Sequence, residues 1–153
     1  MGYKNVMEEQ IKTNEMIDKI INLIEEDESK IDWKEMGSEG GIVSRFAKDL
    51  GKKLKTTQLR KFFDEFVKIK AKLESSDLSL DKELYSNILP SVVYARGRDL
   101  CPDSFVNFIK KSIDKILEVN DENIKKKRFD IFMKILESIV SYNKFYELNP
   151  RGK

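Results

Sequence analysis

The hydrophobic pattern of the chain centres on the stretch between residues 56 and 74. Apolar side chains recur there at the three- and four-residue spacing of one helix face, and three phenylalanines (Phe62, Phe63, Phe66) fall within five residues. Thr56 and Thr57 begin this stretch, and a threonine hydroxyl can accept a hydrogen bond from the free amides of a first helical turn. We therefore predict a helix over 56–74, capped by one of these threonines, at the centre of the core.

Five further stretches show the same helical period: residues 5–27, 42–54, 80–98, 102–119 and 121–147. Pro90 predicts a kink or a restart inside the helix over 80–98, because proline removes a helical hydrogen bond and clashes with the preceding turn. Gly97 fits a C-terminal cap, Pro102 a first helical turn and Asp121 an N-terminal cap.

No stretch shows the alternating pattern of a strand bounded by turn residues. Residues 1–153 therefore predict one all-α domain, a bundle of five or six helices. Its apolar stripes predict that Phe62, Phe66, Phe105, Phe108 and Ile135 are buried.

The first 41 residues read as one amphipathic helix, whose stripe begins at Val6, followed by an acidic connector and a glycine-rich junction. The glycines do not match a phosphate-binding loop, which needs a GK[ST] ending or the spaced glycines of a dinucleotide fold. The connector holds the single tryptophan, Trp33. Trp33 fits either a lid over one end of the core, which we favour, or an anchor for a protein partner.

Composition excludes most catalytic and metal chemistry. The chain has no histidine and one cysteine, Cys101, so it lacks the commonest general base and cannot build a Cys/His zinc site. It shows no signal peptide and no apolar run long enough to span a bilayer. We expect a cytoplasmic, non-enzymatic protein without cofactor, metal or membrane contact.

Charge is abundant but nearly balanced, with 37% charged residues and a net charge of +2. Any anion-binding surface must therefore come from clustering. One cluster surrounds the junction of two predicted helices (Lys52, Lys53, Lys55, Arg60, Lys61), and a second is Arg96 with Arg98, near Tyr94. A third opens the last helix, where its cations oppose the helix dipole: Lys125, Lys126, Lys127 and Arg128. Solvated helix surface is the alternative for each.

Three segments carry a resemblance to a known family. LKTTQLRKFFDEFVKIKAKL (54–73), LPSVVYARGR (89–98) and FDIFMKILESIVSYNKFY (129–146) resemble the small subunit of type III-A CRISPR effector complexes, the Csm complexes. The likeness covers about residues 42–146, and residues 1–41 depart from the family pattern.

The resemblance implies a non-catalytic, helical, RNA-binding subunit that acts in antiviral defence. Several copies would stack in a filament beside the backbone subunits and along the guide RNA–target RNA duplex. RNA and DNA cleavage and cyclic oligoadenylate synthesis would belong to the backbone and large subunits. Such a subunit must accept any sequence, so it should contact phosphates and sugars. We expect one continuous basic surface from Lys52, Lys53, Lys55, Arg60, Lys61, Arg96 and Arg98, with Thr57 and Gln58 adding hydrogen bonds.

Two other functions stay open on the sequence. A helical protein–protein adaptor without nucleic-acid binding would use Trp33, Tyr142 and Tyr146 as anchors. A DNA-binding regulator would use residues 42–74 as a helix-turn-helix, but the outer face of its second helix carries Lys61, Glu65, Lys68 and Lys72, a poor set for reading bases. The cations of residues 125–128 stay a weaker candidate for RNA contact.

Overall fold

The computed structural model describes residues 3–75 and 78–150. Its helices are α1 (Tyr3–Glu25), α2 (Trp33–Gly37), α3 (Ile42–Leu50), α4 (Thr56–Ser75), α5 (Leu80–Lys82), α6 (Leu89–Gly97), α7 (Asp103–Leu117) and α8 (Glu122–Leu148), with a 3-10 turn η1 (Glu28–Lys30) and a π-helical segment η2 (Glu83–Ile88). Residues 76 and 77, in the polar break before α5, lie outside the described part, as do 1–2 and 151–153.

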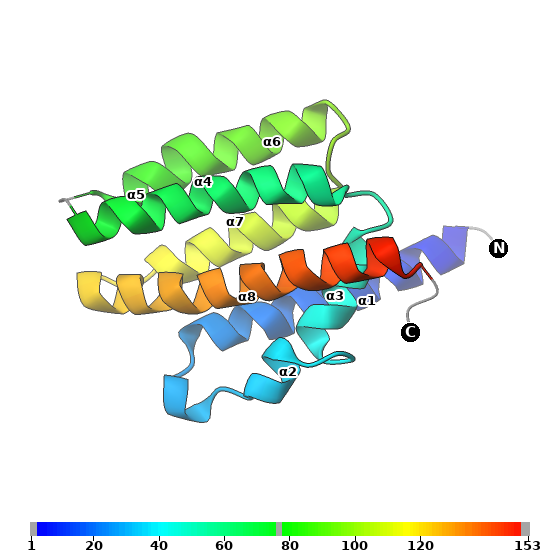
Figure 1. Cartoon of the computed structure of the whole chain (residues 1–153), viewed down its shortest axis with the longest axis horizontal. Coiled ribbons are helices and arrows are strands. Elements are labelled where there is room, and N and C mark those ends of the chain that lie inside the picture. The colour runs from blue at the N-terminus through cyan, green and yellow to red at the C-terminus, as the bar shows by residue number, and fades with distance from the viewer. Residues whose placement is uncertain (1–2, 76–77, 151–153) are drawn as a thin grey trace.

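The described residues form an all-α bundle without strands, as the sequence predicts (Figure 1). The segment from α5 through η2 to α6 is continuous, so the long helical units number six, and α2 and η1 are short additions. The π-helical segment ends just before Pro90, which has no N–H to donate to the carbonyl four residues earlier. At the preceding residue, the Leu89 N–H bonds the Leu84 carbonyl, five residues back, which is the hydrogen bond of a π-helix.

The helix at the centre of the bundle is α8. The hydrophobic pattern predicts that α4 lies there, and this prediction is wrong. Figure 1 shows α8 crossing the middle of the molecule, and it packs against α1, α2, α3, α4 and α7. Its buried residues lie on most sides of the helix: Lys125, Phe129, Ile131, Phe132, Met133, Ile135, Leu136, Ile139, Val140 and Asn143. A helix covered on most sides loses the one-sided stripe by which a central helix is sought.

An aromatic cluster joins the helices in the core. Phe66 of α4 lies 5.0 Å from Phe132 of α8 between ring centroids, and Phe108 of α7 lies 5.2 Å from Phe46 of α3. The five residues predicted to be buried are all buried, which confirms that part of the pattern: Phe62, Phe66, Phe105, Phe108 and Ile135. Val6, which begins the predicted stripe of the first helix, is exposed instead, and so are Val67 of α4 and Ile124 of α8.

The bundle has two ends with different connections. One end, called here the junction end, carries the α3–α4 and α6–α7 connections together with the start of α1 and the finish of α8 (right side of Figure 1). The opposite end carries the end of α4, the start of α5 and the α7–α8 connection. The first two basic clusters therefore lie at the junction end, and the third lies at the opposite end.

Candidate functional site

The α3–α4 connection is a tight turn held from inside. Gly51 and Leu54 both donate backbone hydrogen bonds into the last turn of α3, to the carbonyls of Ala47 (3.1 Å) and Leu50 (2.8 Å). The Leu54 side chain is buried while its neighbours are exposed, which leaves Lys52, Lys53 and Lys55 on the surface. One apolar residue thus anchors the turn and presents three lysines.

The threonines at the start of α4 do not cap it by the route that the sequence suggests. The Thr56 hydroxyl donates to Oδ1 of Asn143 at 2.7 Å, and Thr57 is exposed in the first turn. The Asn143 Nδ2 donates to the Ala47 carbonyl at 3.4 Å, so this buried amide of α8 ties α3 to α4. Sequence reasoning missed Asn143, although its place four residues after Ile139 and three after Val140 puts it on the inward stripe.

Cations of the first cluster differ in how far they are neutralised. Lys52 pairs with Asp49 at 3.5 Å, and Lys53 lies close enough to Asp103 to lower the pKa of that carboxyl, after the larger effect of Arg96. The remaining three, Lys55, Arg60 and Lys61, are exposed and make no side-chain hydrogen bond or ion pair within the described part of the chain. Gln58 is half-buried beside them.

One carboxylate lies at the edge of this group. Hydrogen bonding with Thr56 lowers the pKa of Glu147, which is exposed near the end of α8. Lys144 pairs with the same carboxylate at 3.5 Å. The local field at the start of α4 is therefore positive but not uniform.

The second cluster lies where α6 ends in a Schellman motif. The Leu100 N–H bonds the Ala95 carbonyl at 2.9 Å and the Asp99 N–H bonds the Arg96 carbonyl at 3.0 Å. The left-handed residue that this motif requires is Asp99, with φ of 61°, and Gly97 is an ordinary helical residue. The expected cap at Gly97 is therefore wrong by two positions.

Arg96 and Arg98 have different surroundings. The Arg96 Nε donates to Oδ1 of Asp103 and its Nη1 lies 3.9 Å from Asp99, and the hydrogen bond to Asp103 raises the pKa of Arg96. Arg96 thus joins the end of α6 to the start of α7. Arg98 is exposed, with its guanidinium carbon 5.8 Å from the centroid of the Tyr94 ring.

A groove of about 760 Å³ brings parts of the two clusters together. It lies between α1, the end of α3 and the α6–α7 connection, and three of the predicted cations line it: Lys52, Lys53 and Arg96. Four carboxylates line it as well: Glu9, Asp49, Asp99 and Asp103. The groove therefore has mixed charge, and the other predicted residues lie outside its lining.

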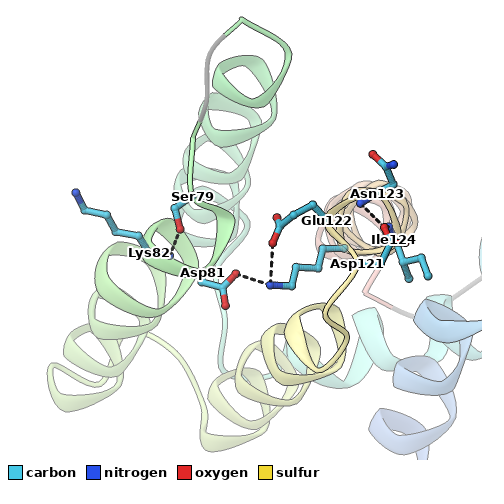
Figure 2. A network of polar contacts seen from close by, with 8 residues as sticks. Ser79, Asp81, Lys82, Asp121, Glu122, Asn123 and Ile124 are labelled. Carbon is cyan, nitrogen blue, oxygen red and sulfur yellow. Dashed lines mark hydrogen bonds and ion pairs between the residues drawn. The ribbon is translucent and has the colours of Figure 1, made fainter.

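The third cluster has a structural role in half of its members. Lys125 is buried, and its Nζ lies 3.0 Å from Oδ1 of Asp81 and 3.2 Å from Oε1 of Glu122 (Figure 2). The Arg128 Nη1 donates to the Lys115 carbonyl at 2.6 Å and pairs with Glu118 at 3.1 Å. Lys126 and Lys127 are exposed. The expected capping of α8 by Asp121 is confirmed, since its Oδ1 accepts from the backbone of Asn123 at 2.8 Å.

Trp33 is half-exposed on α2 and does not close the core. The Lys134 Nζ lies 5.2 Å from its ring centroid, and the ring borders a shallow hollow of about 450 Å³ between α2 and α8. The two tyrosines expected as further anchors are engaged internally. Tyr142 donates to the Gly37 carbonyl at 2.7 Å, and the Tyr146 hydroxyl lies 2.9 Å from that of Ser44.

Within residues 3–75 and 78–150, no helix combines the length and apolar character needed to cross a membrane. The same residues contain no group of three or more acidic, cysteine or histidine side chains arranged to hold a metal ion.

Comparison with known families gives a match. Residues 39–149 match the family described as Csm2 Type III-A, which is more than half of the chain. The chain belongs to the Csm2 Type III-A family. It is accordingly a small subunit of the type III-A Csm effector complex, and the sequence resemblance over 42–146 is confirmed. Comparisons with curated proteins and with solved structures gave no match. The family match begins after Trp33, so α1 and α2 lie outside it.

Proposed function

We propose that this Csm2-family chain is a non-catalytic RNA-binding subunit, with the junction end as its RNA contact. Several copies would stack along the guide RNA–target RNA duplex in the cytoplasm, beside the backbone and large subunits. Membership of a structural subunit family supports this division of labour, and the absence of histidine agrees with it.

The observation that carries the proposal is the group of unpaired cations at the start of α4. Lys55, Arg60 and Lys61 are exposed, have no acidic partner in the described part of the chain, and flank a first helical turn whose amides favour anions. An unpaired surface cation is free to replace the counterions of a phosphate backbone. Arg98, at the same end, is also without an ion pair there.

Backbone contact predicts binding that depends on salt and ignores sequence. Contacts to about four phosphates would give a log–log slope of affinity against salt near −3 to −4, from the roughly −0.7 to −0.9 per phosphate of single strands and duplex DNA. A single isolated copy would bind weakly, since repetition along one guide adds affinity.

The test is a titration of RNA of several sequences at several salt concentrations, with the protein alone and within the assembled complex. Arg60→Ala should weaken all sequences alike and flatten the slope by about one unit. Lys126→Ala is the matched control, because Lys126 is an exposed cation at the opposite end without a partner in the described part of the chain. Equal binding by the parent and both variants would contradict the proposal, and so would equal losses in the two variants.

The adaptor is the second candidate, and Trp33 is the observation that favours it. Among the three expected anchors, Trp33 alone is exposed in the described structure, beside a hollow, and tryptophan is enriched at interface hot spots. In that case Trp33→Ala would abolish incorporation into the complex while RNA titrations of the parent protein showed no affinity. The DNA-binding alternative has less support, because Lys68 on the outer face of α4 pairs with Glu65 at 3.5 Å.

A further inference from the structure

Tyr94 is an aromatic side chain left in solvent at the junction end. It is 67% exposed on the last turn of α6, and its hydroxyl makes no hydrogen bond within the described residues. A ring in water forgoes the burial that makes aromatic residues valuable in a core. Packing therefore does not explain its presence.

A second tyrosine on the same helical unit shows what an internal role looks like. Tyr85 of η2 is also partly exposed, but its hydroxyl donates to Oδ1 of Asp114 on α7 at 2.7 Å. That hydrogen bond, with burial and the nearby charges of Asp114 and Asp81, raises the pKa of Tyr85 to about 12. Tyr85 thus fastens η2 to α7 in acidic surroundings, whereas Tyr94 faces solvent beside a cation.

The backbone fixes Tyr94 and Arg98 relative to each other. The Arg98 N–H bonds the Tyr94 carbonyl at 3.1 Å, and the Schellman motif through Asp99 and Leu100 ends the helix directly after Arg98. The guanidinium therefore lies over the ring, with 5.8 Å between its carbon and the ring centroid. Within the described residues the two planar side chains have no other partner, and together they form a preorganised surface.

We propose that Tyr94 and Arg98 form a stacking platform for one unpaired nucleobase of the bound RNA. The inference rests on the proposed RNA contact and adds a substrate class to it: a strand with an unstacked nucleotide in preference to an uninterrupted duplex. Stacking tolerates every base, because each has a π face, so the platform does not conflict with sequence-independent binding. The Arg98 charge holds the adjoining phosphate.

The experiment uses the full chain and two RNA duplexes of equal length. One is uninterrupted, and the other carries a single unpaired 2-aminopurine, whose fluorescence falls when it stacks. The parent protein should bind the second duplex more tightly and quench its fluorescence. Tyr94→Leu should lose the quenching and bind that duplex roughly tenfold more weakly, with unchanged affinity for the uninterrupted one.

Three variants separate stacking from charge and from folding. Tyr94→Phe keeps the ring and should behave as the parent. Arg98→Lys keeps the charge and should retain the salt slope while losing part of the preference for the unpaired base. Tyr85→Leu is the matched control, since it removes an exposed ring outside the platform and should leave both duplexes unaffected. Circular dichroism of each variant checks that the helices persist.

The outcomes are distinguishable. If the parent binds both duplexes with the expected salt slope but Tyr94→Leu equals the parent on both, the platform is wrong and the proposed function stands. If the parent binds neither, the proposed function and the platform fail together. If Tyr94→Leu binds RNA normally yet fails to enter the effector complex, Tyr94 is a protein contact and the stacking assignment is wrong.

Discussion

The two ends of the bundle hold their helices together by different chemistry. At the junction end, the neutral amide of Asn143 connects α3 and α4 through Ala47 and Thr56. At the opposite end, charged side chains do this work, since Lys125 joins α8 to Asp81 of α5, and Arg128 joins α8 to the end of α7. Both of those cations are nearly covered, with 10% and 14% of the side chain exposed.

The difference explains why clusters with similar basic residues differ in how many of their cations are paired. A cation that holds two helices together is neutralised by carboxylates, so its charge binds a phosphate only weakly. A junction held by an amide leaves its cations unpaired, as Lys55, Arg60 and Lys61 are in the described structure. Arg96 and Lys52 are exceptions at the junction end, because Asp103 and Asp99 engage Arg96 and Asp49 pairs with Lys52.

The largest expected effect tests the neutral junction itself. Asn143→Ala removes an acceptor for Thr56 and a donor to Ala47 in a buried setting, which should lower the free energy of unfolding by about 2 kcal/mol. It should also weaken RNA binding without touching RNA, because the start of α4 loses its support. Urea denaturation and an RNA titration measure the two effects.

A double-mutant cycle with Thr56→Val shows whether the hydrogen bond is responsible. Coupled residues give an interaction free energy of about 0.5–3 kcal/mol, whereas independent ones add. Asn123→Ala, an exposed asparagine on the same helix, is the control for helix propensity and should change little. Additive effects of Asn143 and Thr56 would show that the junction is not held by this amide.

A smaller effect is expected from the charged end. Lys125→Met keeps the buried stem but removes two ion pairs, and a loss of about 1 kcal/mol is expected, because Asp81 and Glu122 are half-exposed or more and can be hydrated again. The loss should shrink in high salt, unlike that of Asn143→Ala. RNA affinity should not change.

The same variant has a pH signature. The hydrogen bond with Asp81, the largest influence and opposed by burial, raises the pKa of Lys125 above its ordinary value of 10.5. The stabilisation is therefore complete below pH 10.5 and is lost as the pH rises through the higher pKa of the folded state. Denaturation of parent and variant at neutral and alkaline pH should converge at the alkaline end. A constant difference would mean that Lys125 acts through packing alone.

Local periodicity was sufficient to predict the helices and the five named core residues, because both depend on neighbours within one or two turns. It was insufficient to predict which helix lies at the centre of the bundle, since α8 is buried on most sides and shows a weaker apolar stripe than α4. Val6 shows a related limit: its helix extends past the part of the bundle that would cover it (Figure 1).

The positions of the basic clusters could be predicted from the sequence, but the pairing of their cations with carboxylates could not. The clusters and their residue types are visible in the sequence, and the Csm2-family segments add to them. Which cations are paired depends on residues far away in the chain, as with Lys125 and Asp81, or on the path of a loop, as with Arg96 and Asp103. Asn143 was missed because a polar residue on an inward stripe reveals its partners only once the helices are packed.

The smallest expected effect concerns a residue that lies beside the proposed RNA contact without belonging to it. Gly97 lies between Arg96 and Arg98 and is helical. Apart from its chain neighbours and the backbone of its own helix, no described atom lies within 4 Å of the position where a Cβ would stand. Gly97→Ala should therefore stabilise the protein by about 0.5–1 kcal/mol, since alanine favours the helix and restricts the unfolded chain. Thermal unfolding should shift upward by about 1–4 °C. The sequence interpretation of Gly97 as a left-handed cap predicts the opposite sign.

Gly40→Ala is the matched control, because Gly40 also has open space around it but has φ of 83°, and alanine there should be destabilising. RNA affinity should be the same in both variants, because neither changes a cation or the Tyr94 ring. A lower melting temperature for Gly97→Ala would mean that α6 ends at Gly97, which would also remove the fixed spacing between Tyr94 and Arg98.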